Sequence, residues 1–285
     1  MVERTVDIGG GRSLGYREYG DPDGSPVVNC HGGLVCGLDV APFHDAARAI
    51  GVRVISPDRP GLGASSPSPG RTTADWADDV RALLDRLSIE QAAVFGWSMG
   101  GQYALGCAAI LPDRVTRTVV VAGAVPLDDA TAFGELNPMD RRLTDLSRNH
   151  AKIAQHSFST LGRITRHAPR AWTRMMARDA TTAEADALRS LSDPGLASAA
   201  ARALASGAGM VEEYRAWVRP WGFAPEAIGG PVRLWQGDAD TLVPPKWATT
   251  LAQRIPGARL ELLPGEGHFL GYRNQAEILR ALVGA

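Results

Sequence analysis

The sequence predicts an α/β fold class: a mostly parallel eight-stranded sheet flanked by helices, with an inserted helical segment. Strand-like and helix-like segments alternate in residues 1–125 and again in residues 230–285. The apolar run Ala92–Phe95 leads directly into a serine between glycines, which predicts a strand that turns sharply into a helix. The alternation stops in residues 126–229, a stretch too long for a simple loop. Strands separated by helices require right-handed crossovers, so we expect most strands to pair in parallel.

In the first half, apolar or alternating runs bounded by glycine and proline predict the strands. They are a two-stranded hairpin over Val6–Tyr19, broken by three glycines, and single strands at Pro26–Cys30, Val52–Ser56, Ala92–Phe95 and Val115–Val121. Helices are expected near Pro42 to Ile50, after a cap at Thr72 or Thr73, and from the serine motif to Pro112. The second of these helices presents an apolar face at helical spacing, which predicts packing against the sheet. This face consists of Trp76, Val80, Leu83, Leu84 and Leu87.

Residues 126–229 are rich in helix-forming patterns and in large apolar side chains, so we expect a helical cap inserted over the sheet. The core domain is then formed by residues 1–125 and 230–285 together. After the insertion, the sheet and its covering helices resume. The expected elements are strands at Val232–Trp235 and Arg259–Leu263 and helices at Lys246–Ile255 and Gln275–Val283.

Composition and charge limit the partners that this chain is expected to bind. With 285 residues, of which 45% are hydrophobic, the chain can bury a large core, and its net charge of −1 argues against nucleic acid as the main partner. No apolar run approaches the roughly 18 residues of a membrane span, so we expect a cytoplasmic protein without membrane association. Cys30, Cys36 and Cys107 are odd in number and lack metal-ligand spacing, so they are interpreted as reduced thiols and no metal site is expected.

The segment Gly96-Trp97-Ser98-Met99-Gly100-Gly101 has the pattern of a nucleophile elbow. The turn forces the serine into a strained backbone conformation and brings its neighbours close to adjacent chain. Bulk is therefore excluded two residues before and two residues after the serine, where the sequence has glycine. The apolar strand before the motif and the helical periodicity after it supply the structural setting that the pattern requires. Ser98 is accordingly the candidate nucleophile.

A serine hydroxyl is a poor nucleophile at neutral pH and needs a base, which in turn needs a group that orients it. His268 lies in a glycine-containing loop just after the last expected strand, and Asp240 lies just after the preceding one. All three side chains therefore follow the carboxyl ends of parallel strands, where open α/β sheets place their sites. The acid position has alternatives, namely Asp238 beside Asp240 and the pair Asp128 and Asp129 after the sixth strand.

With these motifs in this order, the chain resembles the α/β-hydrolase superfamily, in the capped serine-hydrolase branch. That branch includes carboxylesterases, lactonases, cofactor-free haloperoxidases and C–C bond hydrolases. Two more motifs contribute to the resemblance: His31-Gly32-Gly33 is similar to the oxyanion turn, and Asp58 to Ser65 is similar to the loop after the fourth strand. The resemblance covers nearly the whole chain and favours Asp240 as the acid, because the pattern Gly-x-x-Asp before Val-Pro places the acid at its fourth position.

The resemblance also implies an oxyanion hole formed by two backbone N–H groups that are aimed before the charge develops. Met99, immediately after the nucleophile, is expected to supply one of them. Gly33 is expected to supply the other, with Leu34 as the alternative because the proline that usually follows this turn is missing here. His31 is interpreted as a residue that braces the neighbouring loops by hydrogen bonds.

Apolar side chains of the elbow, the oxyanion turn and the insertion are candidates for the substrate pocket. They are Trp97, Leu34, Trp172, Met175 and Met176. The insertion also carries a basic series whose default interpretation is a solvated face. The series comprises Arg141, Arg142, Arg148, Lys152, Arg163, Arg166, Arg170, Arg174 and Arg178. The alternative is recognition of an anionic substrate or an acidic carrier protein, since the Gly-Trp-Ser elbow resembles that of carrier-protein methyl esterases.

These residues predict a serine hydrolase that cleaves a carboxylic ester of a small molecule through an acyl-enzyme, with no metal or organic cofactor. The same groups are also suited to a lactone, to a C–C bond beside a ketone or to perhydrolysis. Peptidase action on N-terminal proline is disfavoured by the missing proline of the oxyanion turn. A non-catalytic binding protein of the same fold is the alternative of another class. The pattern does not predict an oligomeric state.

Overall fold

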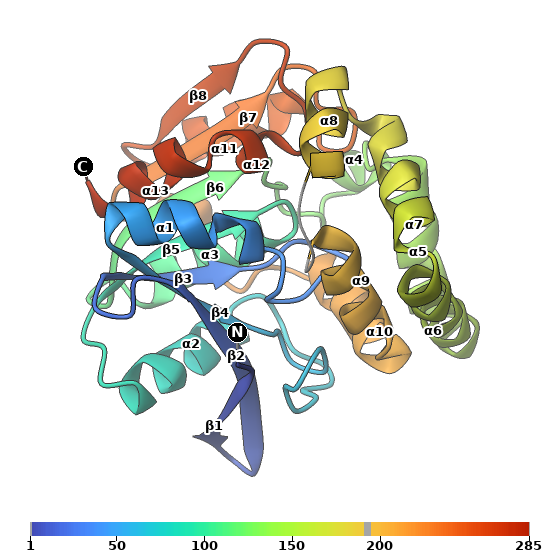
Figure 1. Cartoon of the computed structure of the whole chain (residues 1–285), viewed down its shortest axis with the longest axis horizontal. Coiled ribbons are helices and arrows are strands. Elements are labelled where there is room, and N and C mark those ends of the chain that lie inside the picture. Colours follow the sequence, from blue (N-terminus) through green and yellow to red (C-terminus); the bar gives the residue numbers. More distant parts are fainter. Residues whose placement is uncertain (1, 191–194, 285) are drawn as a thin grey trace.

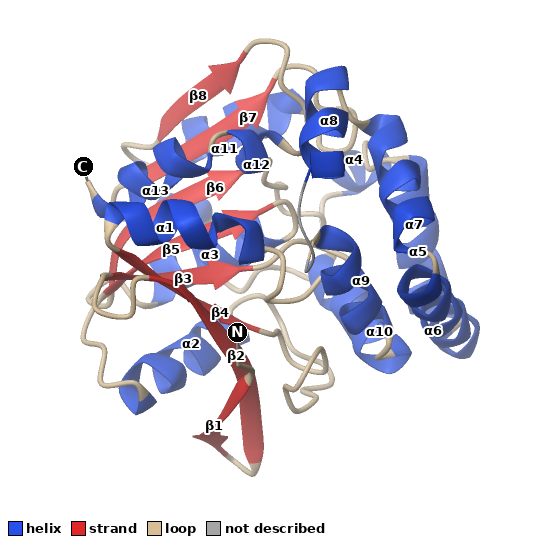
Figure 2. Cartoon of the chain, in the orientation of Figure 1, coloured by secondary structure: helices blue, strands red, loops and turns tan. Residues whose placement is uncertain are grey.

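Eight strands form one twisted sheet in the computed structural model, which describes residues 2–190 and 195–284 (Figures 1 and 2). Their order across the sheet is β1-β2-β4-β3-β5-β6-β7-β8. Strands β1 and β2 are antiparallel to each other, β2 is antiparallel to β4, and the remaining neighbours are parallel. The strands are β1 (Arg4–Gly9), β2 (Arg12–Gly20), β3 (Ser25–Cys30), β4 (Val52–Pro57), β5 (Ala92–Trp97), β6 (Val115–Val121), β7 (Val232–Gly237) and β8 (Arg259–Leu263). The predicted fold class is confirmed.

Helices cover both faces of the sheet. In Figure 1, α1 and α13 pack together in front of the strands, and α2, α3 and α11 lie behind them. Because both faces are covered, the central strand β5 is buried at every position, which explains its uninterrupted apolar sequence. These helices are α1 (His44–Ile50), preceded by the short η1 (Ala41–Phe43), α2 (Asp75–Arg86), α3 (Gly100–Ile110), α11 (Pro245–Arg254), α12 (Leu270–Arg273) and α13 (Gln275–Val283).

The start of α2 differs from the prediction of a threonine cap. The helix begins at Asp75, and the residue before it, Ala74, has no capping side chain. Thr72 instead donates both its backbone N–H and its hydroxyl to the Asp75 carboxylate, at 2.7 and 3.0 Å. Thr73 faces the other way and accepts a hydrogen bond from Gln102 at 2.7 Å. The two threonines therefore fix the loop before the helix.

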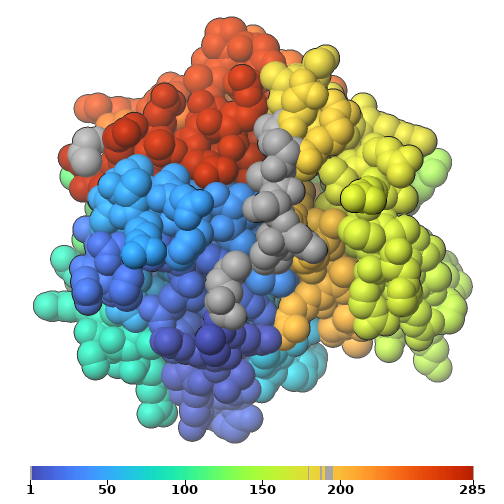
Figure 3. Space-filling model, in the orientation of Figure 1, coloured from blue at the N-terminus to red at the C-terminus, as the bar shows by residue number. Residues whose placement is uncertain are grey.

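Between β6 and β7, the described residues form helices and no strands (Figure 2). Figure 3 shows this part of the chain, in green to orange, on one side of the molecule beside the blue and red ends of the chain. The segments are α4 (Ala130–Gly134), α5 (Pro138–Asn149), α6 (Ala151–His167), α7 (Pro169–Met176), η2 (Ala177–Asp179), α8 (Thr182–Ser190), α9 (Leu196–Leu204), α10 (Gly207–Trp217) and η3 (Pro225–Ala227). The division into a core of 1–125 with 230–285 and a cap of 126–229 stays a prediction.

None of the helices in the described chain is both long enough and apolar enough to pass through a lipid bilayer.

The three cysteines, Cys30, Cys36 and Cys107, are all buried and form no disulfide. Burial raises the pKa of the Cys36 thiol far above its ordinary value, so this thiol stays protonated at neutral pH.

A buried ion cluster joins the helical insertion to the loops of the sheet. Glu213 of α10 is fully buried and accepts hydrogen bonds from Arg59 at 2.6 Å and from Arg71. Arg59 also donates to the carbonyl oxygens of His31 and of Gly32, the latter at 2.9 Å. One carboxylate from the insertion thus compensates two buried cations of the loop that follows β4, and Arg59 links this loop to the one that follows β3.

Replacing Glu213 by alanine is expected to destabilise the protein by about 3 to 5 kcal/mol, because it leaves two buried guanidinium groups without their anion. Urea denaturation measures this change. The neighbouring Glu212 is a matched control, since its ion pair with Arg215 is partly exposed. Glu212→Ala is expected to cost less than about 1 kcal/mol. Equal losses for the two variants would contradict the role assigned to the cluster.

Candidate functional site

Ser98 lies at the sharp turn between β5 and α3 and has a backbone φ of +55°, in the left-handed region. The conformation is strained for a residue with a side chain and is held by tight packing. A Cβ atom on Gly96 would lie 2.6 Å from the Gly100 carbonyl oxygen, and a Cβ on Gly100 would overlap the carbonyl oxygen of Cys30. Both glycines are therefore required by close backbone contacts.

A chain of hydrogen bonds links the serine to a histidine and an aspartate. The Nε2 atom of His268 lies 3.0 Å from Ser98 Oγ, and its Nδ1 atom lies 3.0 Å from Asp240 Oδ2. Asp240 accepts in addition from the N–H groups of Leu242 and Val243 at 2.8 and 2.9 Å. Because the carboxylate is held on both oxygens, it favours the tautomer in which Nδ1 carries the proton and Nε2 is free to accept one.

The electrostatics of this chain suit proton transfer. Burial acts to raise the pKa of Asp240, but the charge of His268 and its hydrogen bond outweigh burial and hold the pKa below its ordinary value. Burial acts to lower the pKa of His268, but Asp240 and two further carboxylates, Glu184 and Asp140, raise it above the ordinary value. Asp240 is therefore ionised at neutral pH, and His268 is a stronger base than a free imidazole.

The other predicted acids lie elsewhere. Asp238 is exposed and accepts from the N–H of Gly265 at 2.7 Å, so it fixes the loop after β8. Asp128 is exposed, and Asp129 caps the start of α4 by accepting from Ala132. In the described residues, Asp240 is the one of these four that contacts His268.

Backbone N–H groups for an oxyanion are available beside Ser98. Gly33, Leu34 and Met99 all line the cavity in front of the serine. Leu34 has a φ of +59°, a second strained position at the site. In the described part of the chain, neither Gly33 N–H nor Met99 N–H donates a hydrogen bond to another protein group. These donors are thus free for a ligand oxygen.

His31 braces the loop that carries Gly33. It is fully buried, its Nε2 atom accepts from the Arg59 N–H at 3.1 Å, and its Nδ1 atom lies 2.9 Å from the Gly32 carbonyl oxygen. Burial and the charge of Arg59 lower its pKa well below the ordinary value, so the imidazole is neutral. On the other side of the loop, Asp39 accepts from the Gly32 N–H at 3.0 Å. His31 therefore has the bracing contacts that the sequence suggests.

The cavity at Ser98 is small and mainly apolar. Its volume is about 60 Å³, less than half of the roughly 150 Å³ that holds one benzene in a protein core. It is lined by Gly33, Leu34, Trp97, Ser98, Met99, Leu136, Met139, Asp140, Met176, Tyr214, Trp217, Leu242, Val243, His268 and Phe269. Trp97 also donates its indole N–H to the carbonyl oxygen of His268 at 3.0 Å, so it both lines the cavity and anchors the histidine loop.

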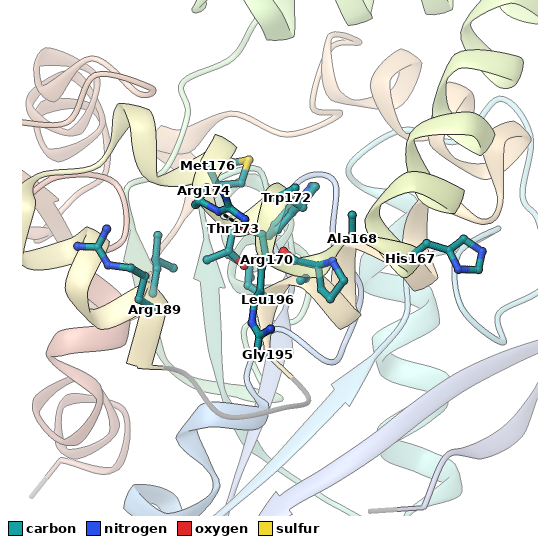
Figure 4. Close-up of a pocket in the computed structure, with 14 residues that line it drawn as sticks. His167, Ala168, Arg170, Trp172, Thr173, Arg174, Met176, Arg189, Gly195 and Leu196 are labelled. Carbon is teal, nitrogen blue, oxygen red and sulfur yellow. Dashed lines mark hydrogen bonds between the residues drawn. The ribbon is translucent and has the colours of Figure 1, made fainter.

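Only some of the residues that the sequence suggests for the substrate pocket line the cavity at Ser98. Leu34, Trp97 and Met176 line the cavity at Ser98, whereas Met175 is 38% exposed and is not among the described residues that line it. Trp172 lines a different, larger cavity of about 870 Å³ between α7, α8 and the start of α9 (Figure 4). Met176 lies one helical turn after Trp172 on the same face of α7 and lines both cavities.

The basic series of the insertion is exposed at every position described, consistent with a solvated face. Arg170 and Arg174 of the series, with Arg189, line the larger cavity, and Figure 4 shows Arg170 and Arg174 close to Trp172. They lie outside the group of residues around Ser98.

Two buried carboxyl groups that no sequence motif indicates act on His268 and its loop. Asp140 of α5 lines the Ser98 cavity and accepts from the Tyr214 hydroxyl at 2.7 Å; burial raises its pKa. Glu184 of α8 accepts from the N–H of Phe269, the residue after the histidine. The Asn-Pro-x-Asp start of α5 is a helix-start signal, but nothing in its spacing indicates which side chains meet the serine.

A family model described as alpha/beta hydrolase fold matches residues 25–274. The chain belongs to the alpha/beta hydrolase fold family. Pimeloyl-[acyl-carrier protein] methyl ester esterase of Aromatoleum aromaticum is 32% identical over 238 residues, which are 80% of this chain and 86% of that protein. The acetyltransferase component of the Pseudomonas putida acetoin cleaving system is 39% identical over 116 residues, or 40% of this chain. The chain spans 31%, 45% and 35% of the length of the first three curated relatives that it matches.

Solved structures of this hydrolase family have the same fold. The enol-lactonase of Burkholderia xenovorans superposes with a TM-score of 0.72 at 20% identity, over 99% of this chain and 98% of that one. The bromoperoxidase of Bacillus anthracis gives a TM-score of 0.72 at 21% identity, over 100% of both chains. At this identity, the likeness establishes the fold alone. The reaction has to be inferred from the residues of the site.

The two aspartates after β7 allow a test that discriminates between the candidates for the acid. Asp240→Asn keeps the shape but removes the charge that orients His268, so we expect a loss in kcat of about 10³- to 10⁴-fold. Asp238→Asn removes a contact to the loop at Gly265 only and is expected to cost less than about tenfold. Steady-state kinetics with a chromogenic ester measures both. Equal losses, or a larger loss at Asp238, would overturn the assignment of the acid.

Proposed function

We propose that this protein is a serine hydrolase that cleaves carboxylic esters of small molecules through an acyl-enzyme intermediate. The observation that carries the proposal is the hydrogen-bonded chain Ser98–His268–Asp240, with 3.0 Å between the atoms of each contact. These three residues lie beside the backbone N–H groups of Gly33 and Met99, which are the two candidate oxyanion donors, at a mainly apolar cavity. Nucleophile, base, orienting acid and oxyanion donors are thus within reach of one bound carbonyl group.

In the proposed mechanism, Ser98 Oγ attacks the ester carbonyl carbon as His268 Nε2 takes its proton. The tetrahedral oxyanion accepts hydrogen bonds from the N–H groups of Met99 and Gly33. His268 then returns the proton to the departing alcohol, leaving the acyl group on Ser98. Water, activated by His268 in the same way, attacks the acyl-enzyme and releases the acid and the free serine. Asp240 stabilises the imidazolium in both halves of the reaction.

The cavity favours a short acyl group with apolar character. Its volume of about 60 Å³ is suited to a few carbon atoms beside the serine. Asp140 supplies the carboxyl group among the described lining residues, and in its ionised form it disfavours an acyl group that ends in a second carboxylate. We propose that residues 126–229 act as a cap, since α5, α7 and α10 supply Met139, Met176 and Trp217 to the cavity wall.

Other reactions use the same groups. Relatives in the comparisons include a lactonase and peroxidases, which keeps a lactone and perhydrolysis as alternatives. Cleavage of a C–C bond beside a ketone stays the third alternative, because it uses the same serine, histidine and aspartate. Ester cleavage is favoured by the methyl ester esterase, because that relative matches over most of both chains. A binding protein without catalysis is disfavoured because the serine, histidine and aspartate are all present and hydrogen-bonded.

Replacing Ser98 by alanine tests the reaction class. We expect kcat to fall by about 10⁴- to 10⁶-fold while substrate still binds, because the attacking atom alone is removed. A fluorophosphonate probe is expected to label the wild-type protein at Ser98 and to leave Ser98→Ala unlabelled. An unlabelled, inactive wild-type protein would support the binding-protein alternative, and a variant that keeps a tenth of the activity would exclude Ser98 as the nucleophile.

The methionine pair of α7 tests the acyl pocket. Met176 lines the cavity at Ser98, so Met176→Ala enlarges it and is expected to raise kcat/KM for octanoate relative to acetate esters by roughly tenfold. Met175 is exposed and serves as the matched control. Met175→Ala is expected to leave the ratio unchanged. Hydrolysis of a series of p-nitrophenyl esters measures the ratio, and an identical profile in both variants would contradict this pocket assignment.

A further inference from the structure

A carboxylate of the helical insertion lies directly behind the histidine loop. Glu184 of α8 is fully buried, and its Oε1 atom accepts from the Phe269 N–H at 2.5 Å. Its Oε2 atom accepts from the N–H and the hydroxyl of Thr181 at 2.9 and 3.0 Å. The carboxylate is thus satisfied by three donors, one of which belongs to the residue after His268. Figure 1 shows α8 beside α12, which Phe269 precedes.

The sequence of the loop is adapted to this contact. A Cβ atom on Gly267 would overlap the carboxylate of Glu184, with its Cδ atom only 3.0 Å away. Glycine before the histidine therefore has a packing reason, because a side chain at this position would displace the Glu184 carboxylate from the Phe269 N–H.

The backbone around His268 is held from two sides. Trp97 of β5 donates its indole N–H to the His268 carbonyl oxygen at 3.0 Å, and Glu184 accepts from the next N–H along the chain. One anchor belongs to the sheet and the other to the insertion. The peptide group that follows the histidine is therefore fixed at both its oxygen and its nitrogen, which limits rotation of the imidazole away from Ser98.

We propose that Glu184 is a positioning residue: through Phe269 N–H, it holds His268 in place between Ser98 and Asp240 and makes this alignment depend on the helical insertion. This inference rests on the proposed function, since it gives Glu184 a role in that reaction. Glu184 touches neither the serine nor the cavity at Ser98. Its effect on turnover is exerted on the position and the charge environment of the imidazole.

Alanine and glutamine substitutions separate the two effects. Glu184→Ala removes the acceptor, and we expect kcat for a short p-nitrophenyl ester to fall by about 10- to 100-fold with little change in KM, since displacement of the base slows chemistry more than binding. Glu184→Gln keeps an oxygen acceptor for Phe269 N–H, so kcat is expected to recover to within about threefold of wild type.

The pH profile gives a readout that a purely structural role would leave unchanged. Asp240, Glu184 and Asp140 are the carboxylates that raise the pKa of His268. Glu184→Gln removes one negative charge, so the pKa of the histidine falls and the acidic limb of kcat/KM moves to lower pH. The base must be neutral to accept the serine proton. At acidic pH, the variant is therefore expected to keep a larger fraction of its own maximal kcat/KM than wild type keeps of its maximum.

Asp186 is the matched control, since it lies on the same helix, is exposed and pairs with Arg189. Asp186→Ala is expected to match wild type in kcat and in pH profile. Thermal melting identifies loss of folding in Glu184→Ala, and in that case the glutamine variant alone decides. A glutamine variant with an unshifted acidic limb, or an alanine variant with wild-type kcat, would overturn the proposal. Wild-type protein that a fluorophosphonate does not label would instead refute the proposed function.

Discussion

The passage of the chain from β5 into α3 is the constraint on which the site depends. Ser98 occupies the left-handed region with a φ of +55°, a conformation that costs on the order of 1 to 3 kcal/mol for a residue with a side chain. The cost is offset by burial of β5 at every position and by close contacts at Gly96 and Gly100 that no larger residue permits. The result is a partly buried hydroxyl on a rigid turn that faces the small cavity, close to the ends of β3, β7 and β8.

A rigidly placed serine can react only if the loop that carries the oxyanion donor is also held in place. A cluster of buried charged side chains holds this loop. Arg59 holds the carbonyl oxygens of His31 and Gly32, and so orients the loop that presents the Gly33 N–H. Its charge is compensated by Glu213, which belongs to the insertion and also pairs with Arg71. Because breaking such a pair leaves an uncompensated buried charge, the insertion and the oxyanion loop are held together.

The sheet was predictable from the sequence, whereas the residues that the helical insertion contributes to the site were not. Strands such as Val115–Val121 and helix Gln275–Val283 have local patterns that fix their limits, and the elbow glycines fix the serine. The insertion has helical periodicity, but which face of each helix meets the sheet depends on packing between helices far apart in sequence. Met176 and Met175 are adjacent, and only their helical orientation, which no single-residue pattern specifies, separates a pocket residue from an exposed one.

The insertion supplies charge as well as shape. Of the three carboxylates that raise the pKa of His268, Asp240 follows β7, whereas Glu184 and Asp140 belong to α8 and α5. In the proposed reaction, these charges favour the imidazolium that forms as Ser98 attacks, which lowers the barrier. They also favour the imidazolium before substrate binds, which withdraws the base as the pH falls. The two insertion carboxylates thus increase the basicity of the imidazole at the expense of activity in acid, a balance that a sheet without the insertion would not have.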